Sequence, residues 1–403
     1  MSTVRTQANP VADLGPQFQH ATPGFRVFCG EHSLDALPRE LDRAGVKRAV
    51  LFYGSSMQRH EGALDCVAAA LGPRLAGRFE GVRQHSPVPS VVAGAKALED
   101  AAADAVIAVG GGSAVVTARA AAILLAEQKD VRELCTRRQG DGRLHSPRLL
   151  QPKLPQWVVA TTPTTAYAKA GSAVRDPATG ERLALFDPKT RAQGAFFHPA
   201  LALTAPASLA FSSALNAFCM AAEGLQSGTD DPLADALLTH ALRMLSEWLP
   251  RLADEPAAAE PRLRTMLAAL LSGQGSDYTG GGLAQAVSHA AGPRSSVANG
   301  VVEAMLLPAV MRYNAPVTGV RLGSVAQALA APGADCADAA DRAIIAVGRL
   351  LSRLGVPRRL RDAGIAREAI PQIVEHTFDD WVITQVPRPV TREGLLALLD
   401  AAW

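Results

Sequence analysis

The segment from Ala103 to Gln128, "ADAVIAVGGGSAVVTARAAAILLAEQ", limits the possible folds of this chain more than any other stretch. A short apolar run ends in three glycines, and an alanine-rich stretch with helical character follows it. A buried strand, a tight turn and a helix in this order begin a βαβ unit. The segment therefore predicts a parallel sheet that is covered by helices.

Other segments repeat this alternation through the first half of the chain. The runs "FRVFCG", "KRAVLFYG" and "QWVVATTPTT" read as strands, and "RDPATGERLALFDPK" reads as a hairpin with its turn at "DPATG". Residues 130–155, rich in Arg, Gly and Pro, are expected to form a surface excursion. From about Ala205 onward, almost every segment has helical periodicity. We therefore expect a mostly parallel α/β domain over residues 1–203 and an all-helical domain over residues 204–403.

Two segments at the ends of predicted strands have the chemistry of a phosphate site. Glycines at a strand-to-helix turn let backbone amides approach a phosphate, and the helix dipole favours its negative charge. Hydroxyl groups at the end of the next buried strand lie where ligands collect in parallel sheets. The predicted cofactor-binding residues are Gly110, Gly111, Gly112, Ser113, Thr161, Thr162, Thr164 and Thr165. A tight turn for the glycines and turn capping for the threonines are the structural alternatives.

The composition limits the classes of molecule that the chain is expected to bind. The 40 basic and 38 acidic side chains nearly cancel and show no basic stripe, so a small molecule is expected as the partner, with no nucleic acid and no membrane. The five cysteines are widely spaced and are expected to be reduced, buried thiols. The first twenty residues lack the apolar region of a signal peptide, and no run is long enough to span a membrane. We expect a cytoplasmic protein.

A series of motifs resembles the iron-containing alcohol dehydrogenase superfamily, and most of all its maleylacetate reductase branch. They include "FRVFCGEHSLDALPREL", "AVIAVGGGS", "TTPTTA", "DPATGERLALFDP", "SSALNAFCMAAEGL" and "SSVANGVVEAMLLPAVMRYN", in the family's order and over nearly the whole chain. The resemblance implies a dehydroquinate synthase-like architecture, with an N-terminal dinucleotide-binding domain, a helical C-terminal domain and an active site in the cleft between them. It also implies a homodimer.

The chain departs from the family at the metal ligands. Metal-dependent members have an Asp and a His four residues apart, followed by two more histidines. The matching positions here are Asn216, Met220, Gln285 and Asn299. Neutral amides and a soft thioether are poor ligands for iron or zinc. We therefore expect no metal, and a substrate pocket lined by these four side chains.

Other groups must then polarise the substrate, because negative charge develops on its oxygen during reduction. His289, four residues after Gln285 and so on the same helical face, is the candidate general acid. Lys169 and Tyr167 are candidate donors or proton relays, and Lys169 with Arg294 would suit an anionic substrate. The structural alternatives are a core histidine, a solvated loop lysine and, for Met220, core filling.

Further departures concern the cofactor. Val116 and Arg119 replace the acidic residue and the lysine of the family's "GGGSxxDxAK" pattern. The second strand ends at Gly54 without a carboxylate for a ribose hydroxyl, and Ser55, Ser56 and Arg59 follow it. This favours NADP slightly over NAD. Arg182 occupies a family position that contacts the cofactor, with a surface charge on the hairpin as the alternative.

Three functions are compatible with these residues. The first is a metal-independent, NAD(P)H-dependent reductase that acts on a carbonyl or an activated alkene. The second is a non-redox lyase or dehydratase that uses His289 and Lys169 as acid and base. The third is a catalytically degenerate homologue that still binds the cofactor. We favour the first because "GGGS" and "TTPTT" are intact.

Overall fold

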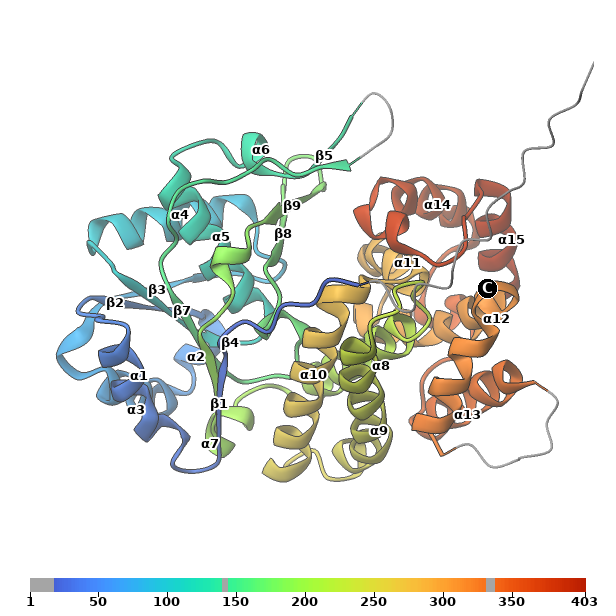
Figure 1. Cartoon of the computed structure of the whole chain (residues 1–403), viewed down its shortest axis with the longest axis horizontal. Coiled ribbons are helices and arrows are strands. Elements are labelled where there is room, and N and C mark those ends of the chain that lie inside the picture. Colours follow the sequence, from blue (N-terminus) through green and yellow to red (C-terminus); the bar gives the residue numbers. More distant parts are fainter. Residues whose placement is uncertain (1–17, 140–143, 331–337) are drawn as a thin grey trace, which may run out of the picture.

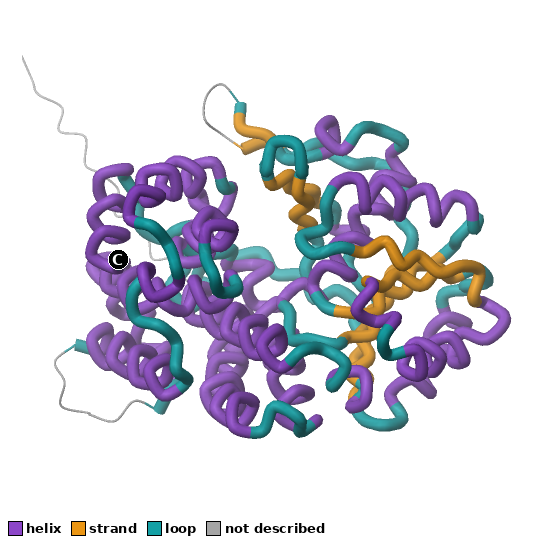
Figure 2. The backbone as a smooth tube through the Cα atoms, turned by 180° about the vertical axis from the view of Figure 1, so that it is seen from behind, coloured by secondary structure: helices purple, strands orange, loops and turns teal. Residues whose placement is uncertain are grey.

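The computed structural model of the chain describes residues 18–139, 144–330 and 338–403. An α/β part comes first in the sequence and a purely helical part follows it (Figures 1 and 2). This confirms the predicted fold class. The last strand of the main sheet ends at Phe197 and the first long helix of the helical part starts at Ala207. The division at residues 203 and 204 stays a prediction.

The main sheet has six parallel strands in the order β1-β10-β7-β4-β2-β3. Their bounds are β1 Arg26–Cys29, β2 Ala49–Gly54, β3 Leu75–Val82, β4 Ala105–Gly110, β7 Gln156–Ala160 and β10 Gly194–Phe197. Strands β2, β4 and β7 consist largely of β-branched and other apolar residues, and both faces of these strands are buried. Their carboxyl ends therefore lie side by side at one edge of the sheet.

Alternate residues of β4 pack into two different cores. Ala105, Ile107 and Val109 pack with helices α1 (Leu37–Arg43) and α3 (Glu61–Leu71). Val106 and Ala108 pack with α4 (Val88–Asp100) and α5 (Gly112–Glu127). The sheet is thus sandwiched between two layers of helices (Figure 1).

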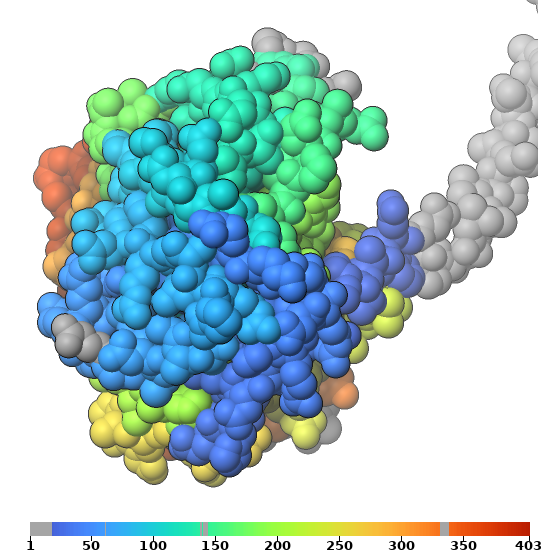
Figure 3. Space-filling model, turned by 90° about the vertical axis from the view of Figure 1, so that its left-hand side faces the viewer, coloured from blue at the N-terminus to red at the C-terminus, as the bar shows by residue number. Residues whose placement is uncertain are grey.

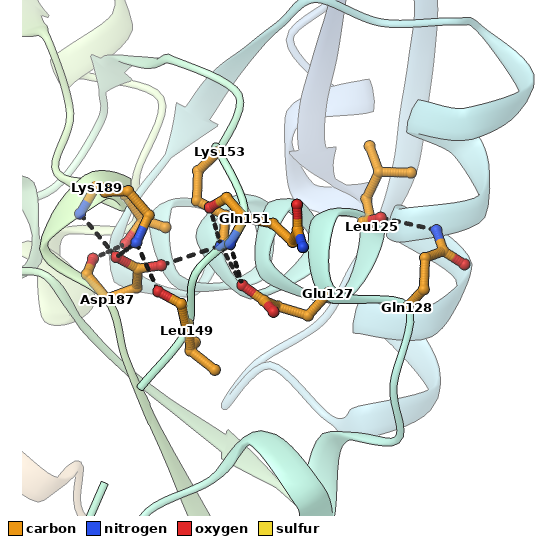
Figure 4. Close-up of polar contacts among 9 residues, drawn as sticks. Leu125, Glu127, Gln128, Leu149, Gln151, Lys153, Asp187 and Lys189 are labelled. Carbon is orange, nitrogen blue, oxygen red and sulfur yellow. Dashed lines mark hydrogen bonds and ion pairs between the residues drawn. The ribbon is translucent and has the colours of Figure 1, made fainter. Parts of the chain in front are cut away.

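The predicted hairpin is present. Strands β8 (Gly171–Arg175) and β9 (Arg182–Phe186) pair antiparallel outside the main sheet, with Ala173 opposite Ala184. The expected excursion contains the short elements α6 (Val131–Leu134), β5 (Arg137–Arg138) and β6 (Leu144–His145). It is fixed to the core by Lys153, whose buried Nζ lies 2.6 Å from Glu127 Oε1 and 3.1 Å from Asp187 Oδ2 (Figure 4).

The helical part surrounds one large core. Its helices are α8 Ala207–Gly224, α9 Pro232–Asp254, α10 Ala259–Thr279, α11 Leu283–Ala291, α12 Asn299–Ala328, α13 Ala339–Arg353, α14 Ile370–Asp379 and α15 Arg392–Ala402. Helix α12 approaches α8 very closely, because a Cβ atom at Gly300 would lie 2.0 Å from the Ser212 carbonyl oxygen. The short helices α2 (Ser55–Gln58) and α7 (Pro199–Ala202) belong to the first half.

The cysteines only partly follow expectation. All four within the described residues are free, but Cys29 and Cys66 are exposed, whereas Cys135 and Cys219 are buried. The expectation of buried thiols was wrong for the exposed pair, since Cys29 lies on edge strand β1 and Cys66 on the outer side of α3. Cys336 lies outside the described residues. So do residues 1–17, which make up most of the segment in which a signal peptide was not expected. No helix in the described ranges is long and apolar enough to cross a membrane.

Candidate active site

The glycine-rich loop and the threonine segment are brought together at the carboxyl edge of the sheet. Strand β4 pairs with β7 so that Gly110 lies opposite Ala160, and the Thr161 amide donates to the Gly110 carbonyl over 3.1 Å. Gly110 has a φ of 146°, which other residues rarely adopt. A Cβ atom at Gly111 would lie 2.4 Å from Thr162 Oγ1, so only glycine fits here. The two predicted phosphate-binding segments form one surface.

The remaining cofactor candidates lie around this surface. Gly54 ends β2 and Ser55 begins α2, beside Val82 at the end of β3. Ser113 lies in the first turn of α5, where its hydroxyl accepts a hydrogen bond from the His85 amide over 3.2 Å. His85 and Ser86 both have positive φ values, 62° and 48°, and lie in a turn between β3 and α4.

Arg119 fixes the loop that carries Lys169. Its buried guanidinium donates to the carbonyl oxygens of Ala166 and Gly171 over 2.8 and 2.7 Å, on either side of Lys169. Burial lowers the pKa of Arg119 to about 10, so the group remains charged at neutral pH. The replacement of the family's lysine by Arg119 therefore creates a clamp on this loop.

Lys169 lies in an environment that perturbs its charge. Burial of the ammonium lowers the pKa of Lys169 to about 8, while the negative charges of Asp277 and Glu303 partly offset this effect. Glu303 comes from α12 and accepts a hydrogen bond from the Asn216 amide of α8. Lys169 is thereby placed near the first of the replaced metal positions.

Glu303 is a group that the sequence did not single out. Its side chain is fully buried, and burial together with the nearby Glu223 raises the pKa of Glu303 well above its usual value. Its second oxygen, Oε1, makes no hydrogen bond within the described residues. The carboxyl group is therefore expected to be protonated and able to donate.

Glu223 has a structural role. Its two carboxylate oxygens accept hydrogen bonds from the backbone amides of Ala284 and Gln285, over 2.7 and 3.1 Å. These amides lie at the N-terminus of α11 and have no partner within that helix. Glu223 thus caps the helix that carries Gln285 and His289.

The other replaced metal positions are occupied by neutral side chains. Met220 is buried in α8, and the amides of Gln285 and Asn299 pack over Gly281 and Gly292. No group of three or more His, Cys, Asp or Glu side chains within the described ranges could share a metal ion. Asn216, Met220, Gln285 and Asn299 do not fit a divalent iron or zinc ion, because they offer no charged or imidazole donor.

His289 has a defined hydrogen-bond partner. Its Nδ1 lies 2.7 Å from Oδ2 of Asp380, and the same oxygen accepts from Arg182 Nη1 over 2.9 Å. The His289 bond and the charge of Arg182 hold the pKa of Asp380 at about 2, although burial opposes this. Burial and the charge of Arg182 lower the pKa of His289, although Asp380 raises it. Neutral His289 therefore donates from Nδ1 and leaves Nε2 free.

The Arg182 contact joins the two halves of the chain. Arg182 begins strand β9, whereas Asp380 follows α14 in the helical part. The guanidinium also lies 5.0 Å from the ring centre of Trp381. Sequence reasoning offered a cofactor contact or a surface charge for Arg182, and it missed Asp380 and Trp381. The cofactor contact stays a prediction.

Two candidates lie elsewhere. Tyr167 is fully buried against Phe197, and its hydroxyl donates to the Thr162 carbonyl, so the expectation that it acts on the substrate was wrong. The phenol supports the threonine segment from within the core. Arg294 lies after α11, where it donates to the Ala290 carbonyl over 2.7 Å and faces His376. Among the described residues, its hydrogen bonds are to the helical half of the chain and not to Lys169.

A glycine-rich loop at the carboxyl edge of a parallel sheet is a usual binding place for a dinucleotide. The helical half of this chain adds a histidine that is paired with a carboxylate. Residues 23–199 match the family described as iron-containing alcohol dehydrogenase, and residues 210–403 match the Fe-containing alcohol dehydrogenase family, C-terminal. The chain belongs to the iron-containing alcohol dehydrogenase family, and it resembles the maleylacetate reductase branch. It is an NAD(P)-dependent dehydrogenase or reductase.

Curated relatives align over almost their full length. Maleylacetate reductase 1 of Cupriavidus pinatubonensis is 28% identical, with 94% of this chain and 95% of the relative covered. Lactaldehyde reductase of Escherichia coli is 27% identical, with 94% and 97% covered. The solved maleylacetate reductase from Rhizobium sp. has a TM-score of 0.77 at 25% identity, with 96% and 98% covered. A solved 1,3-propanediol oxidoreductase, with a TM-score of 0.87 at 23% identity and 96% and 100% covered, shares the fold.

Proposed function

We propose that the protein transfers hydride between NAD(P)H and a carbonyl or activated alkene of a small anionic substrate without a metal ion. The observation that carries this proposal is the His289–Asp380 hydrogen bond of 2.7 Å, on a helix whose metal position holds the neutral Gln285. An imidazole oriented by a carboxylate is a group that transfers protons at neutral pH. It supplies the proton that must accompany hydride transfer.

The proton passes through Nε2 of His289 in either direction. When His289 is protonated, Nε2–H donates to the substrate oxygen, or to the alkene carbon, as the substrate is reduced. When His289 is neutral, Nε2 accepts the hydroxyl proton of an alcohol. Asp380 keeps the second proton on Nδ1 and fixes the ring orientation.

Lys169 supplies positive charge in place of a metal ion. With a pKa of about 8, most of the ammonium is protonated at pH 7, so it can bind a substrate carboxylate or stabilise a developing oxyanion. The protonated carboxyl of Glu303 and the amides of Asn216, Gln285 and Asn299 are further donors. Arg294 has no role in this proposal, because its guanidinium is engaged after α11.

The loop between β4 and α5 is the cofactor site of this proposal. Gly110, Gly111, Gly112 and Ser113 would hold the diphosphate at the N-terminus of a 16-residue helix, with the adjacent threonines beside it. The bound nicotinamide supplies or accepts the hydride. Ser55, Ser56 and Arg59, which follow Gly54, favour a 2′-phosphate, and this favours NADP slightly over NAD.

We also propose that the protein is cytoplasmic and that it forms a homodimer. Within the described residues, the edge strand β1 has one neighbouring strand, β10, and Val27 is 42% exposed. An unpaired edge of this kind can pair with a strand of another chain.

Titration of the protein with NADH and with NADPH, followed by nicotinamide fluorescence, tests cofactor binding. Absorbance of the reduced cofactor is then followed with keto acids, aldehydes and unsaturated acids. Oxidation of the cofactor by an anionic substrate supports the proposal. Tight binding without oxidation by any of these compounds contradicts it and favours a lyase or a degenerate homologue.

A further inference from the structure

A cavity of about 350 Å³ lies between the N-terminal segment, His20–Phe25, and helices α9 and α10. Figure 1 shows this segment running from β1 to α10, and Figure 3 shows it at the surface beside the helical part. Apolar side chains dominate the wall, among them Phe25, Leu237 and Leu233, which remains 51% exposed. Both the volume and the composition are typical of sites that bind small molecules.

The charged side chains on the wall already have partners. Arg191 Nε lies 3.2 Å from Asp277 Oδ2, and His20 Nδ1 lies 2.7 Å from Oδ2 of Asp231. The His20 ring also stacks on Tyr278, with 3.9 Å between the ring centres. A charged ligand would have to compete with these ion pairs and lose its own hydration. The cavity therefore selects against charge.

Two neutral polar side chains on the wall are available for hydrogen bonds to a ligand. Within the described part of the chain, neither the Thr22 hydroxyl nor the Gln274 amide makes a hydrogen bond. Both groups can donate and accept. We propose that this cavity binds an uncharged small molecule with an apolar body and one hydroxyl or carbonyl group, which is held by Gln274 and Thr22.

The cavity adjoins the loop that carries Lys169. Its wall includes Ala168, the residue before Lys169, and Asp277, whose charge acts on Lys169. A bound molecule would therefore contact the loop that carries Lys169 and the Arg191–Asp277 ion pair. Binding itself requires no hydride transfer, so this inference does not depend on the proposed function.

Cumyl alcohol is a suitable probe. It has an aromatic body and a tertiary hydroxyl, so no hydrogen on the carbinol carbon is available for hydride transfer. Calorimetric titration of the full chain should show one saturable site. Benzoate and benzylammonium, which have the same ring with a charge, should bind at least ~10-fold more weakly. Gln274→Leu should weaken binding of cumyl alcohol by ~3–10-fold through loss of one hydrogen bond.

Ala236→Trp fills the cavity from α9, and it should abolish binding. Ala253→Trp makes the same change at an exposed position of the same helix that does not line the cavity, and it should leave binding unchanged. Circular dichroism verifies that both variants are folded. The proposal is overturned by any of three results: no binding to the unaltered chain, equal binding by Ala236→Trp, or tighter binding of a charged probe.

Discussion

Oδ2 of Asp380 lies 2.7 Å from Nδ1 of His289 and 2.9 Å from Nη1 of Arg182. A single carboxylate oxygen therefore orients the imidazole and also pairs with a cation from the other half of the chain. The consequences can be tested by substitution, by pH and by metal analysis.

Asp380→Asn should lower kcat by ~10²-fold or more, because an amide in this position no longer fixes the Nδ1–H tautomer of His289. Steady-state kinetics with the best substrate measures this effect. Asp379→Asn is the matched control, since Asp379 is exposed and adjacent in sequence. Equal activity of the Asp380→Asn variant and the unaltered protein would remove Asp380 from the mechanism.

The pH dependence of kcat/KM should reflect the titration of His289. Burial lowers the pKa of His289 from its ordinary value, which favours the neutral ring that can accept a proton. The kcat/KM for alcohol oxidation should fall as the pH drops through this pKa, and the value for reduction should fall as the pH rises through it. Asp380→Asn should move the midpoint lower, because the Asp380 charge raises the pKa of His289. An unchanged midpoint in that variant would assign the titration to another group.

Lys169→Met should lower kcat/KM by ~10²-fold for an anionic substrate, because a charge-assisted contact is lost. Lys169→Arg keeps the charge and should retain more of the activity. Comparison of the loss in kcat/KM for the anionic substrate with the loss for its uncharged ester distinguishes binding of a carboxylate from stabilisation of an oxyanion. If the anion and the ester lose activity equally, Lys169 acts on the reacting oxygen.

Metal removal should leave the activity unchanged. Asn216, Met220, Gln285 and Asn299 provide no anionic or imidazole ligand, so neither iron nor zinc is expected in stoichiometric amount. Elemental analysis of protein purified without chelator, together with assays before and after treatment with a chelator, measures this. About one metal ion per chain with activity that depends on it would refute a metal-free reaction.

Arg119→Met should lower the free energy of unfolding by about 3 kcal/mol, because buried carbonyl oxygens lose their donor. It should also lower turnover through displacement of the Lys169 loop. Denaturant unfolding and kinetics measure the two effects. Arg349→Met, at an exposed site on α13, should change stability by less than ~0.5 kcal/mol.

The sequence was sufficient for the parts of the fold with strong local patterns. Strands β2, β4 and β7 are largely apolar runs; β2 and β4 end in glycine, β7 is followed by threonines, and the hairpin has a clear turn. Strands β3 and β10 were not recognised. Strand β3, "LAGRFEGV", is an edge strand with charged residues, and β10 has only four residues. Neither has the apolar pattern on which the prediction depends.

The candidate site was predictable where residues share one helical face or follow parallel strands that lie side by side. His289 and Gln285 share a helical face, and the glycine and threonine segments end adjacent strands. Asp380 lies 91 residues from His289, so no spacing could connect them. Tyr167 shows the opposite failure, because proximity to Lys169 in sequence did not reveal that its ring points into the core.

The Arg182–Asp380 pair makes proton delivery depend on how the two halves of the molecule are docked. If the β8–β9 hairpin swings away from the helices, Asp380 loses a cationic partner, and the imidazole that it steers becomes more basic as the guanidinium recedes. The pKa of His289 would then be higher in an open molecule than in a closed one. The Arg182–Asp380 contact would thus control both closure over the reactants and the acidity of the proton donor.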